Sequence, residues 1–293
     1  MSDRLNLLSP SLMLRLEQIS IAAKHRIRGT MQGKRRSSAY GSSLEFADYR
    51  LYAPGDDTRQ LDWHAYGRTG RPFIKLFMDE QELRVNLCLD ATKSMDFAGK
   101  WEYARQLAAA IGYTSLNRYD RVSATAFTTD IAKQLGLLRG KGSAVRLFEF
   151  LAGCQAEGAG DVGAVFRQPS NLPKQPGMTW LFSDFLYEQG VEEALTYLLA
   201  AKQEVVAVQI LAPEELAPEL LGELRLIDSE TGAAKEVAMS RKVLEAYREV
   251  AEQYTSKLRA FCYERGITYM LASTSVPVED FLLSELRRSG LVR

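Results

Sequence analysis

Residues 83–95 read LRVNLCLDATKSM, a short apolar run that ends in an aspartate. Such a run, rich in Val and Leu, is typical of a β-strand buried in a sheet. A second apolar run, at residues 178–182, ends in the same way, at Ser183 and Asp184. We therefore expect two strands that each carry an aspartate at the carboxyl end.

Strand and helix patterns alternate along the chain on both sides of these runs. Strands are expected at 83–89, 121–127, 178–182, 205–211 and 267–271, with a hairpin of 224–227 and 236–239. Helices are expected at 101–119, 143–151, 161–166, 191–202, 241–265 and 278–287. This alternation predicts an α/β fold with a parallel sheet flanked by helices. Ligands of such sheets bind beyond the carboxyl ends of the strands.

The first 80 residues differ from the rest and are rich in Arg, Gly, Ser and Tyr. We expect a helix at 11–27, a basic loop at 24–36 and a strand at 72–77, which together form an irregular N-terminal extension with short strands. The prediction is an N-terminal segment, 1–80, that packs on a main α/β domain, 81–293. The basic loop is open to two interpretations, a solvated loop or a contact with an anionic partner.

Composition excludes several classes of protein. The 293 residues hold 37 Lys and Arg against 37 Asp and Glu, which argues against a dedicated nucleic-acid binder. Cys88, Cys154 and Cys262 lack CxxC spacing, so buried free thiols are expected rather than zinc or disulfides. No run reaches the about 18–20 apolar residues of a membrane helix. Arg15 and Glu17 interrupt the N-terminal apolar stretch, so no signal peptide is expected and the predicted location is cytoplasmic.

Oxygen-bearing side chains follow the first strand at alternate positions. Asp90, Thr92 and Ser94 supply one carboxylate and two hydroxyls that can project to one side of a loop. Asp184 adds a second carboxylate at the same sheet edge. Oxygen ligands of this kind suit Mg²⁺ or Mn²⁺, so a divalent-metal site is predicted. The alternative is that these residues only cap loops and form turns.

This arrangement resembles the metal-ion-dependent adhesion site of von Willebrand factor A domains, whose signature is Asp-x-Ser-x-Ser. Thr92 stands where the signature has its first Ser, and Asp184 matches the family's later strand-end aspartate. The family supplies a further Thr from a Gly-Thr-Asp-like loop, where this chain has Gly160. Asp161 or a water would then complete the metal site. The resemblance implies a Rossmann-like sheet whose metal binds an acidic residue of a partner protein, without turnover.

A second resemblance rests on a longer block. Residues 40–46 read YGSSLEF, 50–63 read RLYAPGDDTRQLDW, and 67–70 read GRTG before FIK at 73–75. The block resembles the signature of the family catalogued as domain of unknown function 58. In that family it precedes a von Willebrand A-like domain, which is the order here. The resemblance implies a protein partner, a MoxR-type AAA+ ATPase, because family members are commonly encoded beside such ATPases.

The same block has two physical interpretations. Both signs of charge lie close together in it, interleaved with aromatic residues: Asp56, Asp57, Arg59, Asp62 and Arg68, with Tyr52, Trp63 and Tyr66. One interpretation is an internal network of ion pairs and hydrogen bonds that braces an irregular segment. The other is a surface that binds a partner, since Arg and aromatic residues are favoured at interfaces.

We therefore expect a non-enzymatic adaptor that binds a partner carboxylate through a divalent metal. A metal-independent scaffold of the same fold is the first alternative. A metal-dependent phosphohydrolase using Asp90 and Asp184 is less favoured, because no nucleophile or general base accompanies them. His64 lies in the upstream block, and Lys93 offers only a positive charge. Residues 136–143, GLLRGKGS, lack the spacing of a phosphate-binding loop.

Overall fold

The computed structural model describes residues 7–21, 45–78, 82–218, 220, 222–227 and 234–291. The chain divides into two compact units, one of residues 1–26 with 83–293 and one of residues 27–82. The boundary near residue 82 lies close to the expected one. The division differs at the start of the chain, because the first 26 residues belong to the larger unit. The predicted basic loop, residues 24–36, lies outside the described part.

A six-stranded sheet forms the centre of the larger unit, in the order β10-β7-β6-β3-β4-β5. Its strands are β3 (Arg84–Asp90), β4 (Arg121–Phe127), β5 (Ile131–Arg139), β6 (Gly177–Ser183), β7 (Gln203–Leu211) and β10 (Thr268–Ser273). All neighbours pair in parallel except β4 and β5, which are antiparallel. The prediction of a parallel sheet is therefore confirmed for five strands and corrected at the edge. Residues 136–143, which we compared with a phosphate loop, belong to β5 and the turn after it.

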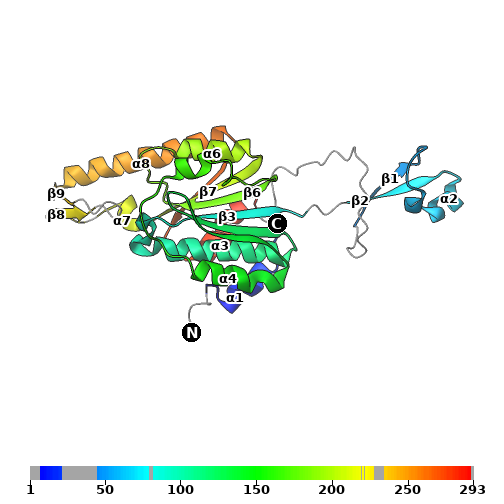
Figure 1. Cartoon of the computed structure of the whole chain (residues 1–293), viewed down its shortest axis with the longest axis horizontal. Coiled ribbons are helices and arrows are strands. Elements are labelled where there is room, and N and C mark those ends of the chain that lie inside the picture. Colours follow the sequence, from blue (N-terminus) through cyan, green and yellow to red (C-terminus); the bar gives the residue numbers. More distant parts are fainter. Residues whose placement is uncertain are drawn as a thin grey trace. The chain divides into compact units, whose positions relative to one another are not determined.

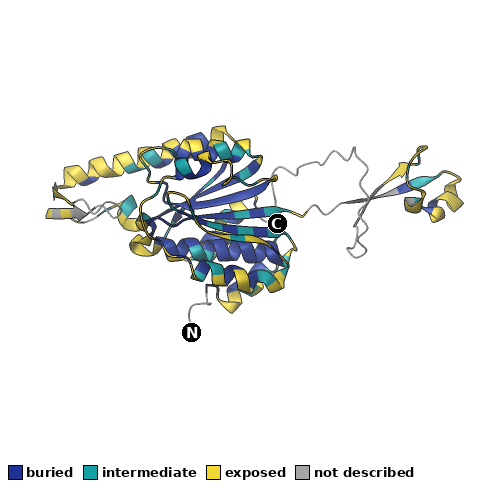
Figure 2. Cartoon of the chain, viewed as in Figure 1, coloured by how far each residue is buried: buried dark blue, intermediate teal, exposed yellow. Residues whose placement is uncertain are grey.

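Helices cover both faces of this sheet (Figure 1). The elements that follow the strands are α3 (Lys100–Asn117), α4 (Ala144–Ala152), α5 (Val162–Arg167), α6 (Val191–Ala200), α8 (Arg241–Glu264) and α9 (Val278–Arg288). One hydrophobic core joins the sheet to α3, α4 and α9, and a second joins it to α5, α6 and α8. All seven residues of β6 are buried, as a central strand covered on both faces requires (Figure 2).

The N-terminal helix α1 (Pro10–Leu16) packs against α3. Ser9 caps it by accepting a hydrogen bond from the backbone N–H of Leu12. After the helix, Glu17 accepts hydrogen bonds from the Tyr113 hydroxyl at 2.5 Å and from the Lys141 ammonium at 2.7 Å. The helix ends at Leu16, whereas the predicted helix continued to residue 27. Residues 17–21 are described and are not helical, so the prediction was too long.

A connecting segment lies between β7 and the long helix α8. It contains α7 (Pro213–Leu216) and the antiparallel pair β8 (Gly222–Ile227) and β9 (Ala234–Met239), which confirms the predicted hairpin. Ser240 then caps α8 through the N–H of Val243. In the part of the chain described here, no helix is both long enough and apolar enough to span a membrane.

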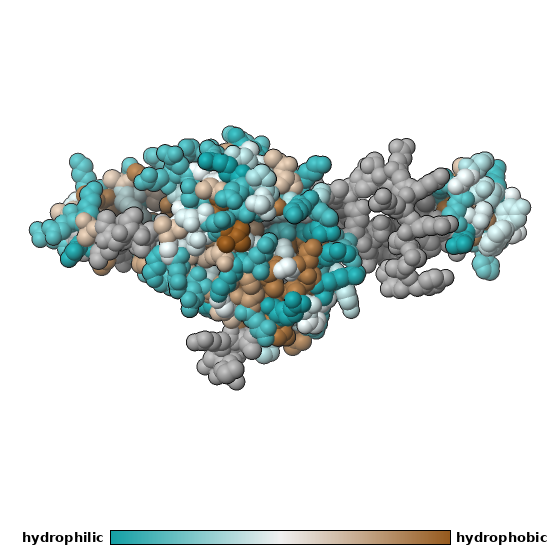
Figure 3. Space-filling view, in the orientation of Figure 1, coloured by the Kyte–Doolittle hydropathy of each residue, from teal (hydrophilic) through white to brown (hydrophobic). Residues whose placement is uncertain are grey.

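The smaller unit contains β1 (Glu45–Leu51) and β2 (Phe73–Met78), which pair antiparallel, and the helix α2 (Trp63–Thr69). Two carboxylates of the predicted network form hydrogen bonds with residues close in sequence. Asp56 accepts a hydrogen bond from the Arg50 guanidinium at 2.8 Å, and Asp57 caps the short helix η2 (Thr58–Gln60). These contacts confirm an internal network for this part of the block. Hydrophilic residues predominate on the face of the molecule shown in Figure 3.

Candidate functional site

The two predicted strand-end aspartates lie at the same edge of the sheet. β3 and β6 are parallel neighbours, and Leu89 pairs with Phe182 one position before Asp90 and Ser183. In a parallel pair the carboxyl ends of both strands lie at the same edge of the sheet, where ligands bind. Asp90 is fully buried and Asp184 is 2% exposed. This confirms the placement that the two apolar runs predicted.

Asp90 is the centre of a hydrogen-bonded group that we call the Asp90 cluster. Its Oδ1 accepts from the backbone N–H of Thr92 at 3.1 Å. Its Oδ2 accepts from the hydroxyls of Ser183 at 2.6 Å and Tyr187 at 2.7 Å. The hydroxyls of Thr92 and Ser94 lie 2.9 Å apart. The cluster thus contains Asp90, Thr92 and Ser94, as predicted, together with two hydroxyls that we did not assign.

Burial controls the protonation of this cluster. Burial, together with the nearby negative charge of Asp184, raises the pKa of Asp90 to about 6, although the hydrogen bonds from Ser183, Tyr187 and Thr92 oppose the change. Burial also raises the pKa of Tyr187, and the charge of Asp90 acts in the same direction. Tyr187 therefore stays protonated at neutral pH, and its hydroxyl donates a hydrogen bond to the Asp90 carboxylate.

The second aspartate is neutralised from within the chain. Oδ2 of Asp184 lies 2.8 Å from the ammonium of Lys100, the first residue of α3. The same ammonium lies 2.6 Å from Oε1 of Glu215 in α7. Lys100 is fully buried, and a buried charge is tolerated only when paired. Phe185, next in the chain, has left-handed backbone with φ 54° and donates its N–H to Ser183 Oγ at 2.8 Å.

The loop before α5 places no ligand where the resemblance expects a threonine. A Cβ on Gly160 would lie 2.1 Å from Cγ2 of Thr92 and 2.8 Å from the Tyr187 hydroxyl, so any side chain there would force these neighbours to move. Asp161 is exposed and caps α5, because its Oδ1 accepts from the N–H of Ala164 at 2.8 Å. The residue we expected to replace the threonine thus has a local structural role.

Only part of the predicted donor set is brought together. Asp90, Thr92 and Ser94 are adjacent, whereas Asp184 faces Lys100 and Asp161 caps a helix. A divalent ion bound directly to Oδ2 of Asp90 would have to compete with the Ser183 and Tyr187 hydroxyls, which both donate to that oxygen. Within the described ranges, no three His, Cys, Asp or Glu side chains are grouped to hold a metal. The structure thus brings together three of the five predicted metal ligands and gives Asp184 and Asp161 other partners.

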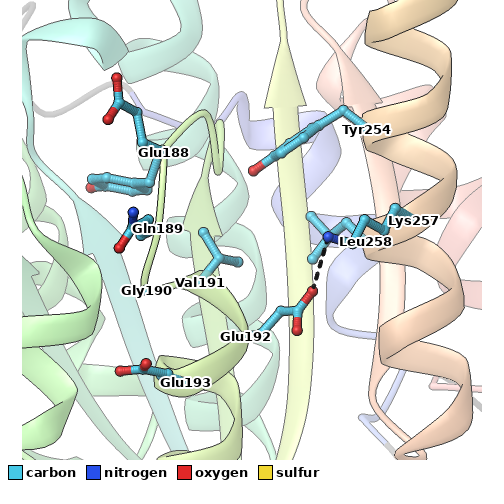
Figure 4. Close-up of a pocket in the computed structure, with 10 residues that line it drawn as sticks. Glu188, Gln189, Gly190, Val191, Glu192, Glu193, Tyr254, Lys257 and Leu258 are labelled. Carbon is cyan, nitrogen blue, oxygen red and sulfur yellow. Dashed lines mark ion pairs between the residues drawn. The ribbon is translucent and has the colours of Figure 1, made fainter.

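A pocket of about 370 Å³ lies beside the cluster, between the loop after β6 and helix α8. Tyr187 lines it and also contacts Asp90. Figure 4 shows Lys257 of α8 facing Glu192 of α6, with 3.9 Å between the charged groups. Tyr254 donates its hydroxyl to the backbone carbonyl of Phe185. The pocket wall is therefore polar and is tied to the strand-end loop.

The cysteines are free and buried, as predicted. Burial raises the pKa of Cys88 to about 12 and that of Cys262 to about 12, and it also raises the pKa of Cys154. A buried thiol of high pKa is a poor nucleophile. His64 belongs to the other unit of the chain. Among the described residues of its own unit, the Asp90 cluster thus has no adjacent thiolate or imidazole.

Comparisons with known proteins give a family but no activity. The model of the family described as "Protein of unknown function DUF58" matches residues 48–257. Uncharacterized proteins of Mycobacterium tuberculosis and Mycobacterium bovis are each 26% identical over 250 residues, which is 83% of this chain and 78% of theirs.

Two solved structures are also similar to this chain. The conserved hypothetical protein BatB from Bacteroides thetaiotaomicron is 14% identical, with a TM-score of 0.43 over 71% of this chain and 98% of that one. An aerotolerance-related membrane protein from Bacteroides fragilis is 14% identical, with a TM-score of 0.42 over 70% of this chain and 99% of that one. The family match includes both the Asp90 cluster and most of the upstream block, and this chain therefore belongs to the DUF58 family.

Proposed function

We propose that this chain is a non-enzymatic protein-interaction module of the von Willebrand factor A type. The proposal rests on the Asp90 cluster at the carboxyl ends of β3 and β6. Its motif, Asp90-x-Thr92-x-Ser94, stands at the strand end where von Willebrand factor A domains bind their partners. A sheet with helices on both faces is the architecture that this resemblance implies.

The module binds its partner without a resident metal. The predicted metal-dependent version needs Asp184 to support the ion and an open position beside Asp90. The contact between Lys100 and Asp184 favours the metal-independent version, because a buried ammonium already supplies the positive charge. The Ser183 and Tyr187 hydroxyls favour it too, since they occupy one oxygen of Asp90.

The partner is a MoxR-type AAA+ ATPase, and the pair acts in the assembly or maturation of other proteins. This part of the proposal comes from the resemblance to the DUF58 family. The partner contacts the rim of the strand-end loops, where Leu186 is 51% exposed two residues after Asp184. Leu186 offers this partner an apolar contact next to the buried polar cluster.

The test is co-purification of the tagged chain with a purified MoxR-type ATPase. AAA+ ATPases use Mg²⁺ with their nucleotide, so Mg²⁺ is present in every sample. Whether this chain needs a metal to bind is therefore tested with variants of its predicted ligands. Ser94→Ala removes a predicted ligand and should leave binding unchanged. Leu186→Asp puts a charge on the proposed contact surface and should reduce binding at least about tenfold, because that charge would lose its water when the partner binds.

Tyr263→Asp is the matched control, because Tyr263 is 85% exposed near the end of α8 that precedes β10. That end of the helix lies at the opposite edge of the sheet, where parallel strands begin. Equal binding by Leu186→Asp and Tyr263→Asp would place the interface elsewhere. Loss of binding in Ser94→Ala would restore the metal-dependent version. No complex with the wild type would exclude this partner.

A further inference from the structure

Two carboxylates lie against the buried ammonium group of Lys100. Its Nζ lies 2.8 Å from Oδ2 of Asp184 and 2.6 Å from Oε1 of Glu215. A buried charge needs one opposite charge to balance it, and Asp184 alone supplies that charge. The contact with Glu215 is therefore an addition that the neutralisation of Lys100 does not require.

The two carboxylates are held differently. Asp184 is 2% exposed, directly follows β6, and its Oδ1 also accepts from the backbone N–H of Leu186 at 3.1 Å. The side chain of Glu215 is 17% exposed and belongs to the short helix α7, which Figure 1 shows beside the start of α3. Its other oxygen, Oε2, accepts from the N–H of Ala212 at 2.8 Å. Because water reaches a partly exposed carboxylate, Glu215 leaves the ammonium at a lower cost than Asp184 does.

Exposed apolar side chains lie next to this ion cluster. Phe97 is 47% exposed, and the centre of its ring lies 5.8 Å from the Lys100 ammonium. Leu186, whose N–H binds Asp184, is also exposed. The cluster is therefore close to the surface at the edge of the sheet to which the proposed function assigns the partner.

We propose that Lys100 is a binding site for a carboxylate from outside the chain, and that Glu215 is an internal carboxylate that occupies this site in the unbound protein. The inference rests on the proposed function, in which a protein partner binds at the carboxyl ends of β3 and β6. The contact with Glu215 shows that a carboxylate fits against this ammonium. An acidic side chain of the partner takes its place, because the positive charge selects an anion.

The exchange links partner binding to the connecting segment between β7 and α8. When the partner's carboxylate binds, α7 loses its contact with the ion cluster. The partner thus competes with a part of this chain, and its apparent affinity is reduced by the fraction of molecules in which Glu215 occupies the site. Glu215 is in this way a built-in restraint on binding.

The first test is chemical rescue with acetate, a small carboxylate, and it needs no partner. Glu215→Ala opens the site, and the variant should fold because Asp184 still balances Lys100. Its melting temperature is measured in potassium acetate and in potassium chloride at the same ionic strength. Acetate should raise it by about 2–4 °C at a concentration about four times above its Kd. The wild type should not respond, since its own carboxylate occupies the ammonium.

Glu214→Ala is the matched control, because Glu214 is exposed in the same helix. It should not respond to acetate. The double variant Glu215→Ala with Lys100→Met lacks the ammonium and should not respond either. Equal behaviour of the Glu215 and Glu214 variants in acetate would overturn the inference, as would a response that persists in the double variant.

The second test is binding to the MoxR-type ATPase. Glu215→Ala should bind it about tenfold more tightly than the wild type, the effect expected when the open site is about one-tenth populated. Glu214→Ala should bind like the wild type. Equal binding by the wild type and Glu215→Ala would show that Glu215 does not compete with the partner and would overturn the inference. If acetate acts as expected but the ATPase binds neither form, the named partner is wrong and the carboxylate site stands, so the two proposals fail separately.

Discussion

The ammonium group of Lys100 lies 2.8 Å from a carboxylate oxygen of Asp184, and both side chains are buried. Glu215, whose side chain is 17% exposed, approaches the same ammonium at 2.6 Å. The three residues come from the start of α3, the end of β6 and helix α7. This ion cluster therefore joins the candidate site to the connecting segment between β7 and α8.

Lys100→Met should reduce the free energy of unfolding by about 3–5 kcal/mol, because it leaves buried carboxylates without a counter-charge. Met keeps the length of the side chain, so the loss reports on charge more than on packing. The measurement is urea unfolding at neutral pH. Adding Asp184→Asn to Lys100→Met should recover part of the loss, since the two residues are coupled.

The exposed pair of Arg167 and Glu193 is the control for this experiment. Their groups lie 3.0 Å apart, but the side chains are 62% and 57% exposed. Arg167→Met should therefore cost less than about 1 kcal/mol. A similarly small loss in Lys100→Met would show that water reaches the cluster and that the charge does not need its partner.

Gly160→Ala should destabilise the protein by about 1–3 kcal/mol, as overpacking of a buried site does. The added Cβ would lie 2.1 Å from Cγ2 of Thr92. Thr92→Ser removes that methyl group, so the double variant should regain part of the stability. Thermal unfolding measures both effects, with Gly142→Ala as control, because nothing lies within 4 Å of a Cβ there. Equal stability of the Gly160 and Gly142 variants would contradict the close approach.

The central strands could be predicted because local pattern and topology agree. The runs before Asp90 and Ser183 are short and apolar, and strands of that kind in a βα alternation are buried and parallel. Their aspartates then have to meet at one edge. β5 was missed because it is an edge strand with most of its residues exposed, so its sequence lacks a buried face.

The charged and aromatic partners in the site could not be predicted in the same way. Lys100 and Glu215 are far apart in sequence, and each alone would be expected at the surface, where most Lys and Glu lie. Tyr187 lies in a loop that carries no periodic pattern. Their roles arise only when the fold brings α3, α7 and the loop after β6 to one place. Gly160 was noticed as a departure from a motif, but its steric reason requires the position of Thr92.

Asp90→Asn should change how stability depends on pH. The pKa of Asp90 is raised to about 6 in the folded protein, from a usual value of 3.8. The folded state therefore favours the protonated form, and this contribution to stability is present in acid and lost as the pH rises through about 6. Asn cannot ionise, so the variant should gain stability relative to the wild type as the pH rises from about 4 to about 6, by up to about 3 kcal/mol, and keep that gain at neutral pH.

Unfolding midpoints measured from acid to neutral pH check this expectation. Ser94→Ala leaves the Asp90 carboxylate in place and should keep the pH slope of the wild type. If the curves of the wild type and Asp90→Asn run parallel, the carboxyl group titrates as an exposed one would, and the cluster is open to water.

Magnesium should leave the melting temperature of the wild type unchanged relative to EDTA. A ligand that binds only the folded state stabilises it by about 2.7 kcal/mol at a concentration a hundredfold above its Kd, so even modest binding is detectable.

Lys100→Met provides the informative contrast. In that variant Asp184 and Glu215 lack a counter-ion, and a divalent cation is then the species that can compensate them. The melting temperature of Lys100→Met should rise with Mg²⁺, while that of the wild type does not. The opposite result, a saturable rise in the wild type that Ser94→Ala removes, would mean that the ion displaces the hydroxyls from Asp90. The lysine would then stabilise the metal site from behind, and partner binding would have to depend on the metal.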